Sequence, residues 1–103
     1  MPKLVRDKIP AIIGPNAKYR EASADEYKRA LANKLLEEAN EFRDQPSVEE
    51  LADVLEVVAA ITRAYGWPMM TVTQVRMDKA EKRGKFEKRY ILEDPPGVDS
   101  MGG

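Results

Sequence analysis

Five acidic residues surround one short turn of this chain, and their spacing predicts a common site. Glu37, Glu38 and Glu41 precede the turn, and Glu50 and Asp53 follow it. Three residues advance an α-helix by about 300° and about 4.5 Å, so Glu38 and Glu41 share a helix face. Glu50 and Asp53 share a face in the same way. Carboxylates at about 5 Å repel by roughly 3 kcal/mol per pair at an effective dielectric near 20, and a divalent cation would remove that cost.

Two helices joined by this turn would place the acidic residues at the same end of an antiparallel hairpin. Glu41 would then pair with Glu50, and Glu38 with Asp53 about 4.5 Å further along each axis. Helices pack about 8–10 Å apart, a gap that these side chains can span around one or two ions. Acidic residues near the end of the first helix also oppose its dipole. Such local conflicts are typical of functional sites, so both observations favour a metal site.

Each half of the motif also has a purely structural explanation. Exposed helices are often rich in Glu, and like-charge neighbours cost only about 0.2–0.5 kcal/mol per pair in solvent. Glu50 can serve as the third helical residue of a capping box that begins at Ser47. The alternative function is therefore a non-catalytic helical interaction or regulatory module that retains an acidic, ion-binding face.

The residue types narrow the ion and the reaction. The chain has no His and no Cys, which excludes catalytic triads, thiolate chemistry and histidine-ligated zinc. Oxygen ligands alone suit Mg²⁺, with Mn²⁺ as the other candidate. Protein-bound Mg²⁺ usually completes its shell with water and substrate phosphates. The predicted chemistry is metal-assisted attack of water on a phosphoric anhydride.

Phosphates also need cations from the protein. Lys34 lies one turn before Glu38 on the same face, and Lys79 and Arg83 lie one turn apart in a later helix. We predict that these three residues bind substrate, and the alternative for them is solvated surface or ion pairing with Glu or Asp. That alternative is the better interpretation of the other basic residues. Tyr65 and Trp67 could stack on a base, but packing around a helix end is favoured.

Composition indicates one domain, over residues 1–93, followed by a disordered tail over residues 94–103. The 103 residues carry 17 basic and 18 acidic side chains, so the charge pattern does not predict nucleic-acid binding. No apolar stretch is long enough to span a membrane, and no targeting signal opens the chain. We expect a soluble, cytoplasmic protein without a membrane partner.

The predicted fold is mainly all-α, a bundle of about three helices with short extended segments near both ends. Capping residues Ser23 and Ser47 begin helices that end near Asp44 and Tyr65, with Tyr27, Leu31, Leu35 and Phe42 of the first helix buried. A third helix begins at Met69 or Thr71 and ends at Arg83. We expect an extended arm or strand over residues 1–22 and a strand over residues 86–93. Apolar residues surround the second helix over residues 54–61, which predicts a bundle completed by another subunit.

Two acidic motifs give the chain a family resemblance. Glu37-Glu38-x-x-Glu41 and Glu50-x-x-Asp53 resemble the paired motif of the MazG-type all-α nucleoside triphosphate pyrophosphohydrolases. The segments over residues 3–10 and 79–86 resemble the phosphoribosyl-ATP pyrophosphohydrolase-like subset. The resemblance covers roughly residues 3–93, and eight residues between Glu41 and Glu50 make a short connection for this family.

The resemblance implies hydrolysis of a nucleotide between its α and β phosphates, with nucleotide-pool house-cleaning as the expected role. It implies a homodimer or homotetramer whose subunits share the bundle. By motif position, the Mg²⁺ ligands would be Glu38, Glu41, Glu50 and Asp53. Glu37 would orient water from outside the ligand set, and Lys34 would contact phosphate.

Overall fold

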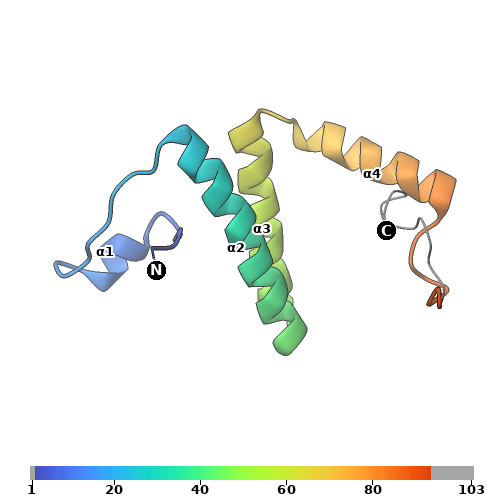
Figure 1. The fold of residues 1–103 in the computed structure, drawn as a ribbon, viewed down its shortest axis with the longest axis horizontal. Helices are drawn as coiled ribbons and strands as arrows, with labels where there is room; N and C mark the ends of the chain where they lie inside the picture. The colour runs from blue at the N-terminus through green and yellow to red at the C-terminus, as the bar shows by residue number, and fades with distance from the viewer. Residues whose placement is uncertain (1, 94–103) are drawn as a thin grey trace. The chain divides into compact units, whose positions relative to one another are not determined.

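The computed structural model describes residues 2–93, which form four helices and no strand (Figure 1). The helices are α1 (Ile9–Ile13), α2 (Ala24–Asp44), α3 (Val48–Tyr65) and α4 (Met69–Arg83). The mainly all-α prediction is therefore confirmed. None of the described helices combines the length and apolarity needed to cross a bilayer. The chain divides between Val72 and Thr73 into two compact units, which are described separately.

Local capping signals set the bounds of α2 and α3, as predicted. The Ser23 hydroxyl accepts a hydrogen bond from the Glu26 backbone N–H at 3.2 Å, and Ser47 accepts one from Glu50 at 3.1 Å. Each bond satisfies a backbone donor that the first helical turn leaves without a partner. At the other end of α3, Gly66 adopts the left-handed conformation (φ 70°, ψ 25°) that glycine tolerates best.

The first unit is built around an antiparallel hairpin of α2 and α3 (Figure 1). Among the described residues, Leu31 of α2 and Val57 of α3 are the buried hydrophobic side chains. Tyr27, Leu35 and Phe42, which we expected to be buried with Leu31, are half-buried. The hairpin thus has a thin apolar core.

Much of the apolar surface of the hairpin remains uncovered within the chain. Leu36 of α2 and Leu51 and Leu55 of α3 each leave half or more of their surface exposed. Of these three residues, only Leu55 lies within residues 54–61, whose other apolar side chains are buried or half-buried. Completion of the bundle by another subunit stays a prediction.

The N-terminal segment differs from the predicted extended arm, because Ile9–Ile13 forms the short helix α1. Pro10 lies in its first turn, where the missing N–H costs no hydrogen bond and the fixed φ suits a helix. Gly14 ends the helix with φ 97°, and its N–H donates to the Pro10 carbonyl at 3.0 Å. Residues 2–6 have no regular secondary structure.

The predicted strand over residues 86–93 is wrong. These residues have no strand conformation, and Phe86, Tyr90 and Ile91 are largely exposed. A strand needs a neighbouring strand for its backbone groups, and the described residues contain none. Arg89 also has a positive φ of 58°, which interrupts extended backbone. The predicted tail, residues 94–103, lies outside the described residues.

The cap of α3 gives the first testable prediction. Ser47→Ala removes the acceptor of the Glu50 N–H, so we expect the free energy of unfolding to fall by about 1 kcal/mol. Urea unfolding followed by circular dichroism measures the change. Ser47→Asp keeps an acceptor and is the matched control. Equal stability of Ser47→Ala and the parent chain would contradict the role of this cap.

Candidate metal site

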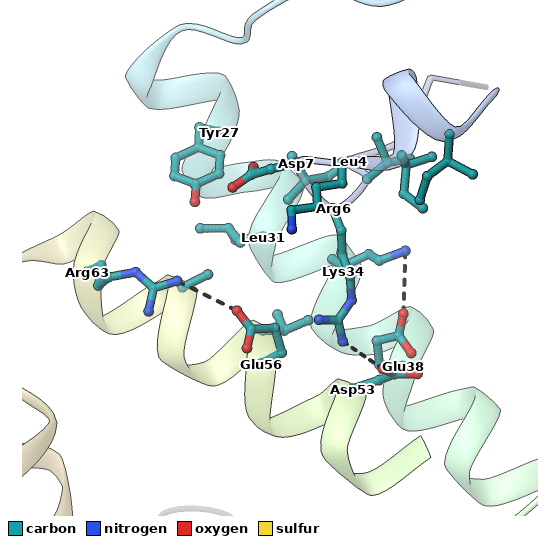
Figure 2. Close-up of a pocket in the computed structure, with 16 residues that line it drawn as sticks. Leu4, Arg6, Asp7, Tyr27, Leu31, Lys34, Glu38, Asp53, Glu56 and Arg63 are labelled. Carbon is teal, nitrogen blue, oxygen red and sulfur yellow. Dashed lines mark hydrogen bonds and ion pairs between the residues drawn. The ribbon is translucent and has the colours of Figure 1, made fainter. Parts of the chain in front are cut away.

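Three acidic residues come together where the end of α2 packs against the start of α3. One carboxylate oxygen from each of Glu38, Glu50 and Asp53 lies within 4.8 Å of the other two. Glu38 comes from α2, and the other two come from the first two turns of α3. We call these three residues the acidic cluster. Figure 2 shows Glu38 and Asp53 next to each other.

Two carboxylate oxygens of the acidic cluster are buried without a partner. Glu38 is 6% exposed, and its Oε2 has no hydrogen-bond partner among the described residues. The Oε2 atom of Glu50 is also buried and has no hydrogen-bond partner among the described residues. A buried acceptor that lacks a donor costs about 1–3 kcal/mol, and more when it is charged. These two oxygens, close to the carboxylate of Asp53, fit the ligand set of a hard divalent cation.

Lys34 ties the predicted water-orienting residue Glu37 to the acidic cluster. Its Nζ donates to Glu37 Oε2 at 2.7 Å and lies 3.4 Å from Glu38 Oε1. Lys3 reaches the other Glu37 oxygen at 3.5 Å. The Lys34 side chain is only 18% exposed, so its contacts are partly shielded from solvent. The ion-pair interpretation of Lys34 thus holds in the structure, and its contact with phosphate stays a prediction.

The electrostatic environment separates the two neighbouring glutamates. Burial raises the pKa of Glu38, and the nearby Glu41 carboxylate raises it further against the opposing effect of Lys34. The hydrogen bond from Lys34 lowers the pKa of Glu37. Burial alone would lower the pKa of Lys34, but Glu37 and Glu38 outweigh it and raise the pKa overall. A cation bound beside Glu38 would therefore favour the charged form of this carboxylate.

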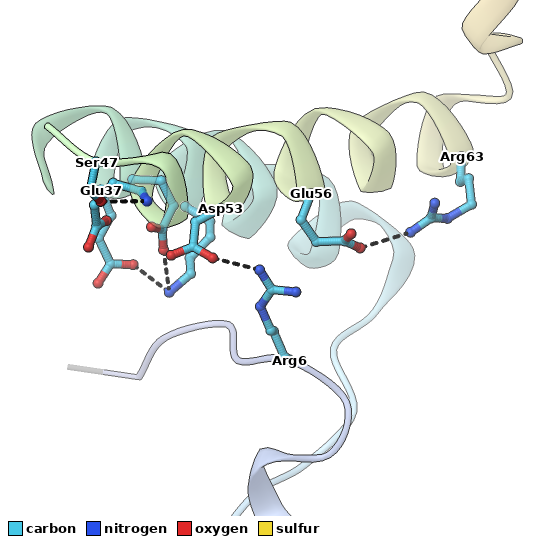
Figure 3. Close-up of polar contacts among 9 residues, drawn as sticks. Arg6, Glu37, Ser47, Asp53, Glu56 and Arg63 are labelled. Atoms are coloured by element: carbon cyan, nitrogen blue, oxygen red, sulfur yellow. Dashed lines mark hydrogen bonds and ion pairs between the residues drawn. The ribbon is translucent and has the colours of Figure 1, made fainter. Parts of the chain in front are cut away.

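A basic residue from the N-terminal segment also reaches the acidic cluster. Arg6 Nη2 donates to Asp53 Oδ1 at 2.7 Å (Figure 3). The two residues are 47 positions apart, and Arg6 was not among the predicted site residues. The sequence drew attention to Arg6 only through its place in the segment over residues 3–10, and that segment did not indicate a contact with Asp53.

Two residues of the acidic cluster, Glu38 and Asp53, line a cavity of about 430 Å³ (Figure 2). The N-terminal segment, α2 and α3 all contribute to its walls. Its apolar lining includes Leu4, Ile9, Tyr27, Leu31, Val57 and Ala60. Its charged lining includes Arg6, Lys34, Glu38 and Asp53, together with Glu56 and Arg63, which lie 3.7 Å apart. Small-molecule sites commonly have volumes of roughly 300–1,000 Å³, apolar walls and a few charged groups.

The remaining predicted residues lie outside the acidic cluster. Glu41 is exposed and does not join the three clustered carboxylates, so the expected pairing of Glu41 with Glu50 is not part of this group. Its assignment as a fourth ligand stays a prediction. Lys79 and Arg83 lie on α4 beyond Val72, in the second unit. Their predicted role in substrate binding also stays a prediction.

Tyr65 and Trp67 pack against each other near the end of α3, which is the arrangement that the sequence favoured. Their rings stack on each other with centroids 4.4 Å apart and an interplanar angle of 13°. The ammonium of Lys28 lies 4.9 Å from the centre of the Tyr65 ring. Both aromatic residues are therefore engaged with neighbours around the C-terminal end of α3.

The structure thus offers oxygen ligands, two buried oxygens without donors, and nearby cations beside a cavity. Comparisons of the chain with models of protein families, with curated proteins and with solved structures found no match. The chemistry of the site is therefore argued from its own residues.

Ion binding to the acidic cluster gives the second prediction. Mg²⁺ or Mn²⁺ should raise the melting temperature in a saturable way, because an ion bound only by the folded state stabilises it. At a concentration 100 times the dissociation constant, the gain is about 2.7 kcal/mol. Thermal melts followed by circular dichroism measure it, with NaCl at equal ionic strength as the reference.

Matched variants separate the acidic cluster from general screening of charge. Asp53→Asn and Glu38→Gln should lose most of the response to the ion. Glu49→Gln removes a negative charge from the first turn of α3 outside the acidic cluster and should keep the response. An equal response to NaCl, or an equal loss in all three variants, would show that no specific ion site exists.

Proposed function

We propose that this chain is a Mg²⁺-dependent nucleotide pyrophosphohydrolase that cleaves nucleoside triphosphates, or related nucleotides, between the α and β phosphates. The products are a nucleoside monophosphate and pyrophosphate. The observation that carries the proposal is the acidic cluster, with its two buried, unpartnered oxygens, at the edge of a cavity. The resemblance of both acidic motifs to the MazG-type enzymes supports the same reaction.

The residues of the acidic cluster would hold the ion through oxygen atoms. Glu38, Glu50 and Asp53 provide the close set, and Glu41 is the further ligand that the motif implies. When bound, Mg²⁺, or Mn²⁺ in its place, neutralises phosphate charge and lowers the pKa of a coordinated water. Glu38 is buried between α2 and α3, so its carboxylate is held in place by the packing of the hairpin.

Glu37 is suited to orient the attacking water. Its pKa is lowered by Lys34, which keeps it an acceptor, and Lys34 and Lys3 hold its two oxygens. In the balanced reaction, the bridging P–O bond between the α and β phosphates breaks and the water oxygen bonds to one of the two phosphorus atoms. The water proton is released to solvent.

The cavity provides a place for the nucleoside. Its apolar lining around Tyr27, Leu31 and Val57 suits a base, and Glu38 and Asp53 at its edge suit a polyphosphate held through a cation. This arrangement would direct the phosphates of a bound nucleotide toward the acidic cluster. House-cleaning of the nucleotide pool is the role that we propose for such an activity.

One observation favours the second candidate, a non-catalytic helical module. Arg6 and Lys34 already contact Asp53 and Glu38, which partly neutralises the acidic cluster without an ion. A structural ion-pair network of this kind would need no substrate. The oxygens of Glu38 and Glu50 that lack partners argue against it, because a purely structural network satisfies its buried groups.

Hydrolysis itself gives the third prediction. With Mg²⁺ and a panel of ribo- and deoxyribonucleoside triphosphates, phosphorus NMR should show pyrophosphate and a monophosphate as the products. Asp53→Asn and Glu38→Gln should reduce kcat/KM by about a hundredfold or more, because several kcal/mol of charge stabilisation are lost. Glu49→Gln should retain the activity. Release of orthophosphate alone, no turnover of any nucleotide, or full activity in Glu38→Gln would refute the proposal.

We also propose that the chain works as a homodimer or a homotetramer. The exposed leucines of the hairpin, Leu36, Leu51 and Leu55, form the surface that another copy would cover. Covering them adds apolar burial to a core in which Leu31 and Val57 are the buried hydrophobic residues of the described part. A second copy is also the partner that the family resemblance implies.

The oligomeric state gives the fourth prediction. Leu55→Glu places a charge on this surface, and burying an unpaired charge is costly, so the oligomer should dissociate. Size-exclusion chromatography with light scattering measures the mass over a range of concentrations. Glu49→Lys changes an exposed polar position of the same helix and should leave the mass unchanged. A parent chain that is monomeric at all concentrations would contradict the proposal.

A further inference from the structure

We propose that Arg6 is a phosphate-binding residue, which Asp53 holds in place until a cation and a polyphosphate enter the site. The inference rests on the proposed function and assigns one side chain to the substrate. The evidence is the contact between Arg6 Nη2 and Asp53 Oδ1 at 2.7 Å (Figure 3) and the place of Arg6 in the wall of the cavity (Figure 2).

The contact contributes little to the stability of the fold. The Arg6 side chain is 58% exposed and that of Asp53 is 38% exposed, and ion pairs exposed to solvent in this way contribute little to stability. Leu4 and Ile9, on either side of Arg6, are half-buried and line the cavity. These apolar contacts hold the N-terminal segment without help from the guanidinium.

The same contact places Arg6 in competition with a metal ion. Asp53 belongs to the acidic cluster, so a divalent cation bound there would draw on the carboxylate that Arg6 now contacts. Two cations that share one carboxylate repel each other. Ion binding therefore weakens the hold of Asp53 on Arg6, and the guanidinium gains from a new anion nearby.

A polyphosphate held by that cation would be this anion. A guanidinium has five N–H donors in a planar fork that matches two phosphate oxygens at once, and one of them is engaged with Asp53. Lys34 is a weaker candidate, because its ammonium contacts both Glu37 and Glu38 and is mostly buried. Arg63 also lines the cavity, but it pairs with Glu56, so Arg6 is the guanidinium of the cavity wall that contacts the acidic cluster.

This arrangement predicts opposite effects of one substitution on two ligands. Arg6→Gln removes the competing charge, so Mg²⁺ alone should bind severalfold more tightly in isothermal titration calorimetry without nucleotide. At saturating Mg²⁺, an α,β-methylene nucleoside triphosphate should bind about tenfold to a hundredfold more weakly, as expected for the loss of a charged hydrogen bond. Arg6→Lys keeps the charge but lacks the planar fork, and its affinity for the analogue should be intermediate.

The controls separate a phosphate contact from a structural role. Lys18→Gln removes one positive charge from an exposed position of the same N-terminal region outside the cavity lining, and it should change neither affinity. In hydrolysis, Arg6→Gln should raise KM by more than it lowers kcat. Weaker binding of both ligands by Arg6→Gln would indicate a structural role and overturn the inference.

The failure of the inference and that of the proposed function are distinguishable. If the parent chain hydrolyses nucleotides and Arg6→Gln binds the analogue equally well, the inference is wrong and the function stands. If the parent chain neither binds the analogue nor hydrolyses any nucleotide, the function is wrong and the phosphate role of Arg6 falls with it. Calorimetry with Mg²⁺ alone then shows whether Arg6 competes with an ion.

Discussion

The packing of α2 against the start of α3 is the constraint on which the site depends. It buries Glu38 beside Glu50 and Asp53, although like charges at this distance repel. The turn between Asp44 and Val48 sets this register, and the hydroxyl of Ser47 caps the new helix. Arg6 and Lys34 partly offset the repulsion among these carboxylates through ion pairs. Two buried carboxylate oxygens have no hydrogen-bond partner and are available to a cation.

The helices could be predicted because their signals are local. Serine caps, a helix-breaking Pro46 and the left-handed Gly66 lie within a few residues of the bounds that they set. The terminal segments were predicted less well, because their conformations depend on partners. Alternation over residues 86–93 suggested a strand, but strand formation needs a neighbour and the N-terminal segment folds as α1. Pro10 favoured the first turn of a helix as much as the end of an arm.

The acidic cluster could be predicted only in part. Helical periodicity with a short turn correctly places Glu38 near Asp53 and brings Glu50 to them. Helical periodicity predicts on which face of a helix a residue lies, but not how deeply its side chain is buried. It therefore did not reveal that Glu38 is buried while Glu41 is exposed. It also missed the contact of Arg6, because a pair 47 residues apart depends on tertiary packing and leaves no local pattern.

The stacked pair at the C-terminal end of α3 has an optical consequence. Trp67 is the only tryptophan of the chain, and its ring lies 4.4 Å from that of Tyr65, close enough for efficient excitation transfer from the phenol to the indole. Gly66 between them holds the left-handed conformation that ends α3. Excitation transfer from Tyr65 to Trp67 therefore reports on the geometry at the C-terminal end of α3, because separating the two rings would weaken it.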